Sequence, residues 1–330
     1  MSVRLTEQPS LYDHLETKSV AELLRDINNE DKKVALAIEK VLPDIGKLCT
    51  AIETQLREGG RFFWLGAGTG GKLGVLDVLE VPNTYGVDPE CWQAVLAGGV
   101  ENLVLDLEEA EDDVDEGWVT LRDKHHISPK DIVVGISASG NTPYVLAAMK
   151  ACKEHGIPCG SICNNPGSPI SAWVDYPIEI VMGPEFITGS TRMKSGTSQK
   201  LLCDMISTTI MVRLGRVQGN RMVCANLINN KVVDRLTRTM VERNPQLSYE
   251  FCEQVIKKTG GLVKAEEYGE GEYLQGGEFV AAAVGTDALQ GPVYRIELDF
   301  GVAPRQGEDT ALILRAYTLM EYVNVVFVKW

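Results

Sequence analysis

The sequence has few of the residues that metal centres and membrane spans require. It contains four His in 330 residues, and none of its eight Cys forms a C-x-x-C pair, so no zinc-ligand pattern emerges. No apolar run reaches the roughly 18 residues of a membrane helix, and the opening residues "MSVRLTEQPSLYDHLETKS" have no apolar signal core. We therefore expect a cytoplasmic protein that has buried, reduced thiols, binds no metal and contacts no membrane.

Basic residues are also scarce. The chain has 32 Lys and Arg against 46 Asp and Glu, a formal net charge of -14. Nucleic-acid backbones attract basic patches, so this balance argues against a nucleic-acid partner. It does not exclude a small anionic ligand, because a helix N-terminus and a few local cations can bind one inside an acidic protein.

What the chain does contain is an alternation of apolar strands and helices. Length suggests about two domains, and we expect an N-terminal helical arm (1–60), a central domain (61–235) and a C-terminal region (236–330) that is helical to about residue 265. The alternation in the central part predicts an α/β fold, a three-layer α-β-α sandwich around a parallel sheet. The expected strands begin near residues 61, 92, 131, 158 and 176.

Local signals set the expected helices. Ser19 is the expected N-cap of a first helix with an apolar face, and a second helix should span about 31–58 and be bent or broken at Pro43. An acidic stretch, 100–125, also has a helical pattern. Thr142 and Pro143 should begin another helix, as N-cap and first residue. Beyond residue 265, strand-like runs follow a loop rich in Gly and Glu, and we assign no function to residues 266–330.

The stretch "WLGAGTGGKLG" contains the spacing G-x-G-x-x-G at Gly66, Gly68 and Gly71. In a dinucleotide site this turn closes a strand, and an acidic residue about 20 residues later ends the next strand. Asp88 and Glu90 have about that spacing but fall in a turn before the next strand. The motif alone is therefore weak support for a nicotinamide or flavin site.

Two further polar loops point to another ligand. "VVGISASGNTPYV" runs from a strand through Ser137, Ser139, Asn141 and Thr142 into a helix start, where orphan backbone N–H groups bind phosphate. "ITGSTRMKSGTSQK" begins the next helix with several hydroxyls. Each loop alone could be an ordinary capped turn. Three such loops at strand-to-helix joints of one sheet favour a phosphorylated, polyhydroxylated ligand.

These residues carry a resemblance. "SASGNTPYV" resembles the phosphosugar-binding loop of sugar isomerase (SIS) domains. Together with "GAGTGGKLGVLDVLEVPNTYGV", "AEDD", "NNPGSPIS" and "GPEFITGSTRMKSGTSQKL", it is similar to the N-acetylmuramic acid 6-phosphate etherases, from about residue 5 to residue 265. The sequence also resembles the glucokinase regulatory protein, which shares the SIS-type, flavodoxin-like fold but lacks the carboxylate in the first helix.

The resemblance implies a carbon–oxygen lyase of amino-sugar metabolism and cell-wall recycling. Its reaction removes D-lactate from carbon 3 of the open-chain sugar 6-phosphate and adds water, giving N-acetylglucosamine 6-phosphate. No metal or redox cofactor is implied, and a homodimer is expected. Two alternatives stay open: a non-catalytic sugar-phosphate sensor that regulates a partner, and an aldose–ketose isomerase, which shares proton abstraction at C2.

The resemblance assigns catalysis to Glu80, in "LEVPNT", and Glu111, in "AEDD". Elimination needs a base for the C2 proton and an acid for the leaving oxygen, and two carboxylates can divide these tasks. Which one is the acid stays open, as does the alternative that each is a surface carboxylate. The expected substrate-binding residues are Gly68, Thr69, Gly70, Ser139, Gly140, Asn141, Thr142, Ser190, Thr191 and Lys194, with Ser139, Asn141 and Thr142 on the phosphate.

Other residues are set apart. Lys194 is expected as a charge partner of the ligand or, alternatively, as a solvated helix residue. Glu185 matches the family pattern without a clear role, and His125 and His126 are expected on the surface. The family's glycine loop has serine where this chain has Gly70 and arginine where it has Lys72. Leu79 and Asn83 also depart from the pattern and are expected to crowd the catalytic end of the helix. A lost neutral hydrogen bond costs about 0.5–1.5 kcal/mol, so weaker activity or another substrate is expected.

Overall fold

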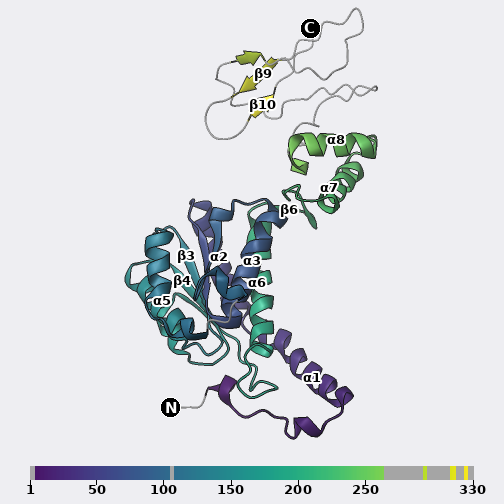
Figure 1. Cartoon of the computed structure of the whole chain (residues 1–330). Coiled ribbons are helices and arrows are strands. Elements are labelled where there is room, and N and C mark those ends of the chain that lie inside the picture. Colours follow the sequence, from purple (N-terminus) through teal and green to yellow (C-terminus); the bar gives the residue numbers. More distant parts are fainter. Residues whose placement is uncertain (1–3, 105–107, 264–292, 296–312, 317–322, 326–330) are drawn as a thin grey trace, which may run out of the picture. The chain divides into compact units, whose positions relative to one another are not determined.

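The computed structural model describes residues 4–104, 108–263, 293–295, 313–316 and 323–325. The chain divides into two compact units, residues 1–220 and residues 221–330. The first contains the predicted sheet, and the described residues of the second form two helices and short strands (Figure 1).

A five-stranded parallel sheet forms the centre of the first unit, in the order β2-β1-β3-β4-β5. Its strands are β1 (Phe62–Gly66), β2 (Trp92–Leu96), β3 (Ile132–Ile136), β4 (Cys159–Cys163) and β5 (Tyr176–Glu179). This is the flavodoxin-like order, in which the direction of winding reverses between β1 and β3. The register pairs Gly66 with Ile136, so the loops that follow these strands begin side by side.

Helices cover both faces of this sheet (Figure 1). The helices of this unit are α1 (Val20–Glu39), α2 (Leu42–Arg57), α3 (Gly68–Tyr85), α4 (Glu116–Val119), α5 (Pro143–Glu154) and α6 (Lys194–Arg213), of which α1 packs on α6. Phe62 and Trp64 face a core shared with α1, α2, α3 and α6. Phe63 and Leu65 face a second core shared with α5. Burial on both faces explains why the strands read as continuous apolar runs, and the predicted three-layer α/β fold is confirmed.

The N-terminal helices differ from the expectation in their boundaries. Ser19 caps α1 as predicted, in a capping box with Glu22. However, α1 continues through Asp31 to Glu39, so the predicted helix start near residue 31 is wrong. Of the two alternatives for Pro43, the structure has the break and not the bend: α1 ends at Glu39, α2 begins at Leu42, and Pro43 lies in the first turn of α2, where its missing N–H breaks no hydrogen bond.

The acidic stretch 100–125 is not the continuous helix that its pattern suggested. Its described part is a series of short turns: 3-10 turns at Val100–Leu103 and Glu108–Asp112, then α4, then a π-helical turn at Thr120–Lys124. Asp113 Oδ1 accepts hydrogen bonds from the backbone N–H groups of Asp115 and Glu116. Side-chain bonds of this kind compete with helix formation, and like charges at helical spacing repel.

The second unit has its own small core. Helices α7 (Asn230–Arg243) and α8 (Tyr249–Thr259) pack together around Leu236 and Ile256, which confirms the helical stretch expected before residue 265. Among the residues described beyond 263, three short antiparallel strands occur: β8 (Val293–Arg295), β9 (Ile313–Ala316) and β10 (Val323–Val325). The two-residue strands β6 (Val217–Gln218) and β7 (Arg221–Met222) lie near residue 220. Strands β8 and β10 fall in the runs predicted as strands. The predicted loop at 266–279 lies outside the described residues.

Candidate functional site

The glycine loop joins β1 to α3 at the carboxyl end of the sheet. Gly68 begins α3 with φ of 51°, a backbone conformation that favours glycine. A Cβ at Gly71 would lie 2.6 Å from the carbonyl oxygen of Gly66, so glycine lets the helix start directly against the strand. Asp88 and Glu90 come before β2 rather than at its end. The glycine spacing is therefore explained by close packing, and the acidic residue of a dinucleotide site is not in its required place.

Glu111 lies against this loop. Its Oε1 atom occupies the side of Gly68 where another residue would carry a Cβ. Thr69, which follows Gly68, lies close to the start of α6: a Cβ at Gly196 would lie 3.1 Å from Thr69 Cγ2. The glycine loop, Glu111 and the start of α6 therefore form one cluster.

Glu80 lies elsewhere on the same unit. It is exposed on α3, twelve residues after Gly68, which corresponds to about 18 Å along the helix axis. Its charge acts on Lys200 of α6. Burial lowers the pKa of Lys200, but Asp204 and Glu80 raise it, and the net pKa is above its usual value. Within one chain, the two predicted catalytic carboxylates are thus well separated.

The loop between β3 and α5 is closed by its own hydroxyls. Ser137 is buried, and its Oγ accepts a hydrogen bond from the backbone N–H of Gly140 at 3.1 Å and lies 2.8 Å from Thr142 Oγ1. Ser139 Oγ accepts from the backbone N–H of Asn141 at 3.1 Å. Thr142 is the N-cap residue of α5 as predicted. Ser137 thus shapes the loop, while the half-buried Ser139, Asn141 and Thr142 line it beside the orphan N–H groups of the helix.

Glu185 has a structural role that the sequence did not reveal. Its buried carboxylate accepts hydrogen bonds from the backbone N–H groups of Lys194 and Ser195, each at 2.9 Å, and from Ser195 Oγ at 2.7 Å. A carboxylate at this position satisfies the first N–H groups of α6 and complements the helix dipole. Ser190 and Thr191 are half-buried in the turn that this cap holds.

Lys194 is buried, with only 1% of its side chain exposed, so the solvated alternative is wrong. Its ammonium forms an ion pair with Glu30 of α1 at 2.5 Å and donates to the carbonyl oxygen of Met182 at 3.3 Å. Burial raises the pKa of Glu30, but hydrogen bonds from Lys194, Lys33 and Tyr12 together outweigh burial, so the net pKa is below its usual value. The ammonium is therefore engaged inside the protein.

The departures from the family pattern have local explanations. A Cβ at Gly70 would lie 2.7 Å from Ile136 Cγ2 and 3.1 Å from Gln199 Oε1, so the space of a larger residue is already filled. Leu79 is 60% exposed, and Asn83 Nδ2 donates to its carbonyl oxygen at 3.3 Å. The expectation that Leu79 crowds the helix is wrong within this chain, because its side chain projects into solvent.

Sequence reasoning missed several buried polar residues of this unit. Asp77 accepts hydrogen bonds from the indole N–H groups of Trp64 and Trp92, at 2.8 and 2.9 Å, and from Ser207 Oγ at 2.8 Å. Burial raises the pKa of Asp77, although these bonds oppose the shift. Asn164 and Gln199 are also buried and bonded to each other. Of these residues only Asn164 had a signal in the sequence, because Asn164 and Asn165 follow a buried strand.

The two adjacent histidines lie away from the loops. His125 and His126 come before β3, at the opposite edge of the sheet from its carboxyl end. His126 is exposed, as expected, whereas His125 is half-buried, and burial lowers its pKa. Among the described residues, no group of three or more His, Cys, Asp or Glu side chains is arranged to hold a metal ion. No helix in the described part of the chain is long and apolar enough to cross a membrane.

The chain matches known protein families. A family model described as the glucokinase regulatory protein N-terminal SIS domain matches residues 44–153, and the SIS domain model matches residues 119–208. Fold and loops thus define a SIS-domain protein. An N-acetylmuramic acid 6-phosphate etherase from Bacteroides thetaiotaomicron is 51% identical over 265 residues, 80% of this chain and 95% of the relative. One from Porphyromonas gingivalis is 49% identical over 267 residues, 81% of this chain and 97% of the relative. The chain belongs to the N-acetylmuramic acid 6-phosphate etherase family.

Solved structures resemble the chain more distantly. A phosphoheptose isomerase from Neisseria gonorrhoeae has 18% identity and a TM-score of 0.45, covering 58% of this chain and 98% of the other. One from Francisella tularensis has 15% identity and a TM-score of 0.44, covering 58% of this chain and 100% of the other. Similarity at this level carries no functional conclusion.

Proposed function

We propose that this chain is a carbon–oxygen lyase that cleaves the D-lactyl ether of N-acetylmuramic acid 6-phosphate. Relatives named for this activity share about half of their residues with this chain over four fifths of its length, which supports the proposed substrate. The observation that carries the proposal is the position of Glu111 against Gly68, beside loops rich in hydroxyls and N–H groups. The products are N-acetylglucosamine 6-phosphate and D-lactate.

The phosphate is assigned to the loop before α5. Ser139, Asn141 and Thr142 are half-buried there, and the helix N-terminus behind them favours an anion. Thr69 and the backbone of the glycine loop line the sugar. Ser190 and Thr191 contact sugar hydroxyls or the lactyl group. Because Lys194 is already paired with Glu30, we assign it to holding the start of α6.

The carboxylates then perform an elimination followed by hydration. A base removes the C2 proton, the electron pair forms the C2–C3 double bond, and the C3–O bond breaks as an acid protonates the leaving lactate oxygen. Water next adds its hydroxyl to C3 while C2 regains a proton. Glu80 and Glu111 divide these two roles. A variant that keeps only the base should still exchange the C2 proton in heavy water without releasing lactate, which makes the assignment measurable.

We infer that the working form is a homodimer in which Glu80 of one copy completes the site of the other. Glu80 lies about 18 Å along α3 from the glycine loop that Glu111 contacts. This separation supports a shared site, because the acid and the base of one elimination must contact neighbouring atoms of the same substrate. Exposed apolar side chains on α1 also support a partner: Val20 is 73% exposed, Leu24 63% and Leu36 62%.

Light scattering tests the homodimer. Wild type should have twice the mass of one chain, and Leu24→Glu should shift it toward the monomer with loss of lactate release. Asp44→Ala changes an exposed residue of α2 and should leave the mass unchanged. A fully active wild-type monomer would contradict the inference.

The activity itself is tested by D-lactate release from N-acetylmuramic acid 6-phosphate by the purified chain. Glu80→Ala should abolish release while the circular dichroism spectrum stays that of wild type. Full activity in that variant would refute its role. Saturable binding of the sugar phosphate without lactate would instead indicate a sensor, and conversion to a ketose without lactate an isomerase.

We place this reaction in the cytoplasm. The thiols of Cys49, Cys152 and Cys203 are free and buried, and burial raises their pKa values, which makes them unreactive. A fusion of the full chain to a fluorescent protein, imaged against a periplasmic marker, tests the location; a periplasmic signal would contradict it.

A further inference from the structure

Two adjacent amides, Asn164 and Asn165, follow the last residue of β4 and are almost fully buried, with 2% and 3% of each residue exposed. The proposed chemistry gives neither a role. Buried polar groups are stabilised only when their hydrogen bonds are made, and a fully bonded group fixes the geometry of all its partners. Their partners therefore show which segments they hold.

Asn165 joins the phosphate loop to the N-terminal segment. Its Nδ2 donates to the carbonyl oxygen of Ala138 and to Thr6 Oγ1, each at 3.0 Å, and its Oδ1 accepts from the backbone N–H of Thr6 at 3.2 Å. Ala138 lies between Ser137 and Ser139 in the loop. Thr6 is itself 2% exposed. One amide thus connects residues that are far apart in the sequence.

Asn164 makes the corresponding connection to α6. Its Nδ2 donates to Ser198 Oγ at 2.9 Å, and its Oδ1 accepts from Gln199 Nε2 at 3.1 Å. The other end of the Gln199 amide, Oε1, lies beside Gly70 of the glycine loop. The paired amides therefore link all three ligand loops.

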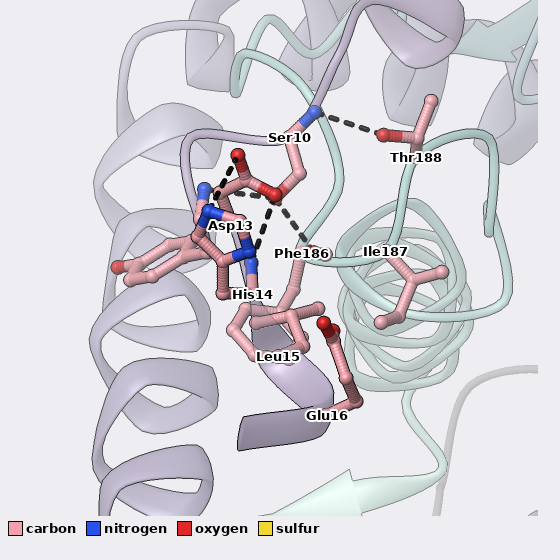
Figure 2. A pocket seen from close by; sticks show the side chains of 9 residues that line it. Ser10, Asp13, His14, Leu15, Glu16, Phe186, Ile187 and Thr188 are labelled. Atoms are coloured by element: carbon pink, nitrogen blue, oxygen red, sulfur yellow. Dashed lines mark hydrogen bonds and ion pairs between the residues drawn. The ribbon is translucent and has the colours of Figure 1, made fainter. Parts of the chain in front are cut away.

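The N-terminal segment also contacts the loop before α6. The backbone N–H of Ser10 donates to Thr188 Oγ1 at 2.9 Å, and Ser10 Oγ donates to the carbonyl oxygen of Phe186 at 2.7 Å. Figure 2 shows these contacts beside a hollow between this segment and the loop before α6. The volume of the hollow is about 280 Å³. Residues 6–10 thus run from Asn165 to the loop that carries Ser190 and Thr191.

We propose that Asn165 and Thr6 are positioning residues that set the phosphate loop at the correct distance from the loop before α6. The inference rests on the proposed sugar-phosphate site. When two loops bind opposite ends of one ligand, the affinity of the protein for that ligand falls if the distance between the loops is no longer fixed. Neither residue touches the substrate: Asn165 acts through Ala138, and Thr6 anchors the segment in which Ser10 bonds Phe186.

The test compares three variants by calorimetry with N-acetylglucosamine 6-phosphate and by steady-state kinetics. Thr6→Val removes the acceptor at nearly constant volume, Thr6→Ser keeps it, and Asn165→Ala removes both partners of Thr6. We expect Thr6→Val and Asn165→Ala to raise Kd and KM by about three- to tenfold, with kcat within a factor of about two, because uniform binding is lost. Thr6→Ser should match wild type.

Asp131→Asn is the matched control. Asp131 is buried in an ion pair with Arg61 at the amino end of β3, away from the loops, so this variant should lower the melting temperature without changing Kd. Thr6→Val with wild-type Kd, or an equal rise in the control, would overturn the inference. So would wild type that fails to bind the sugar phosphate. If wild type binds but releases no lactate, the proposed reaction fails while the Kd comparison still decides this inference.

Discussion

At the scale of single residues, the buried pair of Lys194 and Glu30 shows what the sequence hides. Both side chains are at most 2% exposed, and they join residues that are 164 positions apart. In the sequence, a lysine beside several hydroxyl residues indicates a contact with the ligand. Its partner on α1 becomes evident only when the two helices pack, so no local pattern could predict it.

Removing one partner of this pair should be costly. Lys194→Met leaves the Glu30 carboxylate buried with less charge compensation, and the expected loss of unfolding free energy is about 3 kcal/mol or more. Lys200→Met is the control on the same helix, since Lys200 is partly exposed and pairs with Asp204; about 0–1 kcal/mol is expected there. Urea denaturation measures both, and equal losses would contradict the account.

The pair also predicts a pH dependence of stability. The pKa of Glu30 is lower in the folded chain than its ordinary value of 4.5, so the unfolded chain binds the proton more readily. The contribution of Glu30 is therefore present above pH 4.5 and is lost as the pH falls through the lowered value. The stability difference between wild type and Glu30→Gln should shrink in that window. A difference that stays constant with pH would contradict this assignment.

At the scale of elements, the sheet was predictable because its strands are buried on both faces. Each is a short apolar run that ends in a polar or glycine-rich loop, and the loops after β1 and β3 were correctly placed at strand-to-helix joints. The acidic stretch was not, because its pattern suggested a helix while Asp113 bonds its own backbone neighbours. Near residue 40 the proline signal indicated a bend or a break, and the structure has the break, with Pro43 in the first turn of α2. The helix start predicted near residue 31 is wrong, because α1 continues through that polar stretch to Glu39.

The glycine loop gives a prediction for α3. A Cβ at Gly70 would contact Ile136 within 2.7 Å, so Gly70→Ala should cost about 1–3 kcal/mol of stability through overpacking. Gly46 is the control: it lies inside α2, and a methyl group added there would have no other atom within 4 Å. Gly46→Ala should gain about 0.5–1 kcal/mol from helix propensity. Thermal unfolding separates the two, and a stabilised Gly70→Ala would contradict the packing argument.

At the scale of the whole molecule, the site could be predicted only in part. The three loops are local features, and a resemblance named Glu80 and Glu111. Their separation depends on how α3 runs back along the sheet and on where the short turns of 108–112 return to the glycine loop, and both are tertiary facts. The amides at 164 and 165 belong to the motif "NNPGSPIS", but their partners come from four separate segments, at Thr6, Ala138, Ile180 and Ser198–Gln199.

The central claim is that two glutamates from two chains act on one sugar phosphate, and complementation measures it directly. D-lactate release from N-acetylmuramic acid 6-phosphate is followed for Glu80→Ala, for Glu111→Ala, and for the two variants unfolded together and refolded as a mixture. Each variant alone should be inactive. Random pairing makes half of the dimers mixed, each with one intact site, so about a quarter of wild-type activity should return. A mixture as inactive as its components, at wild-type dimer content, would contradict the shared site.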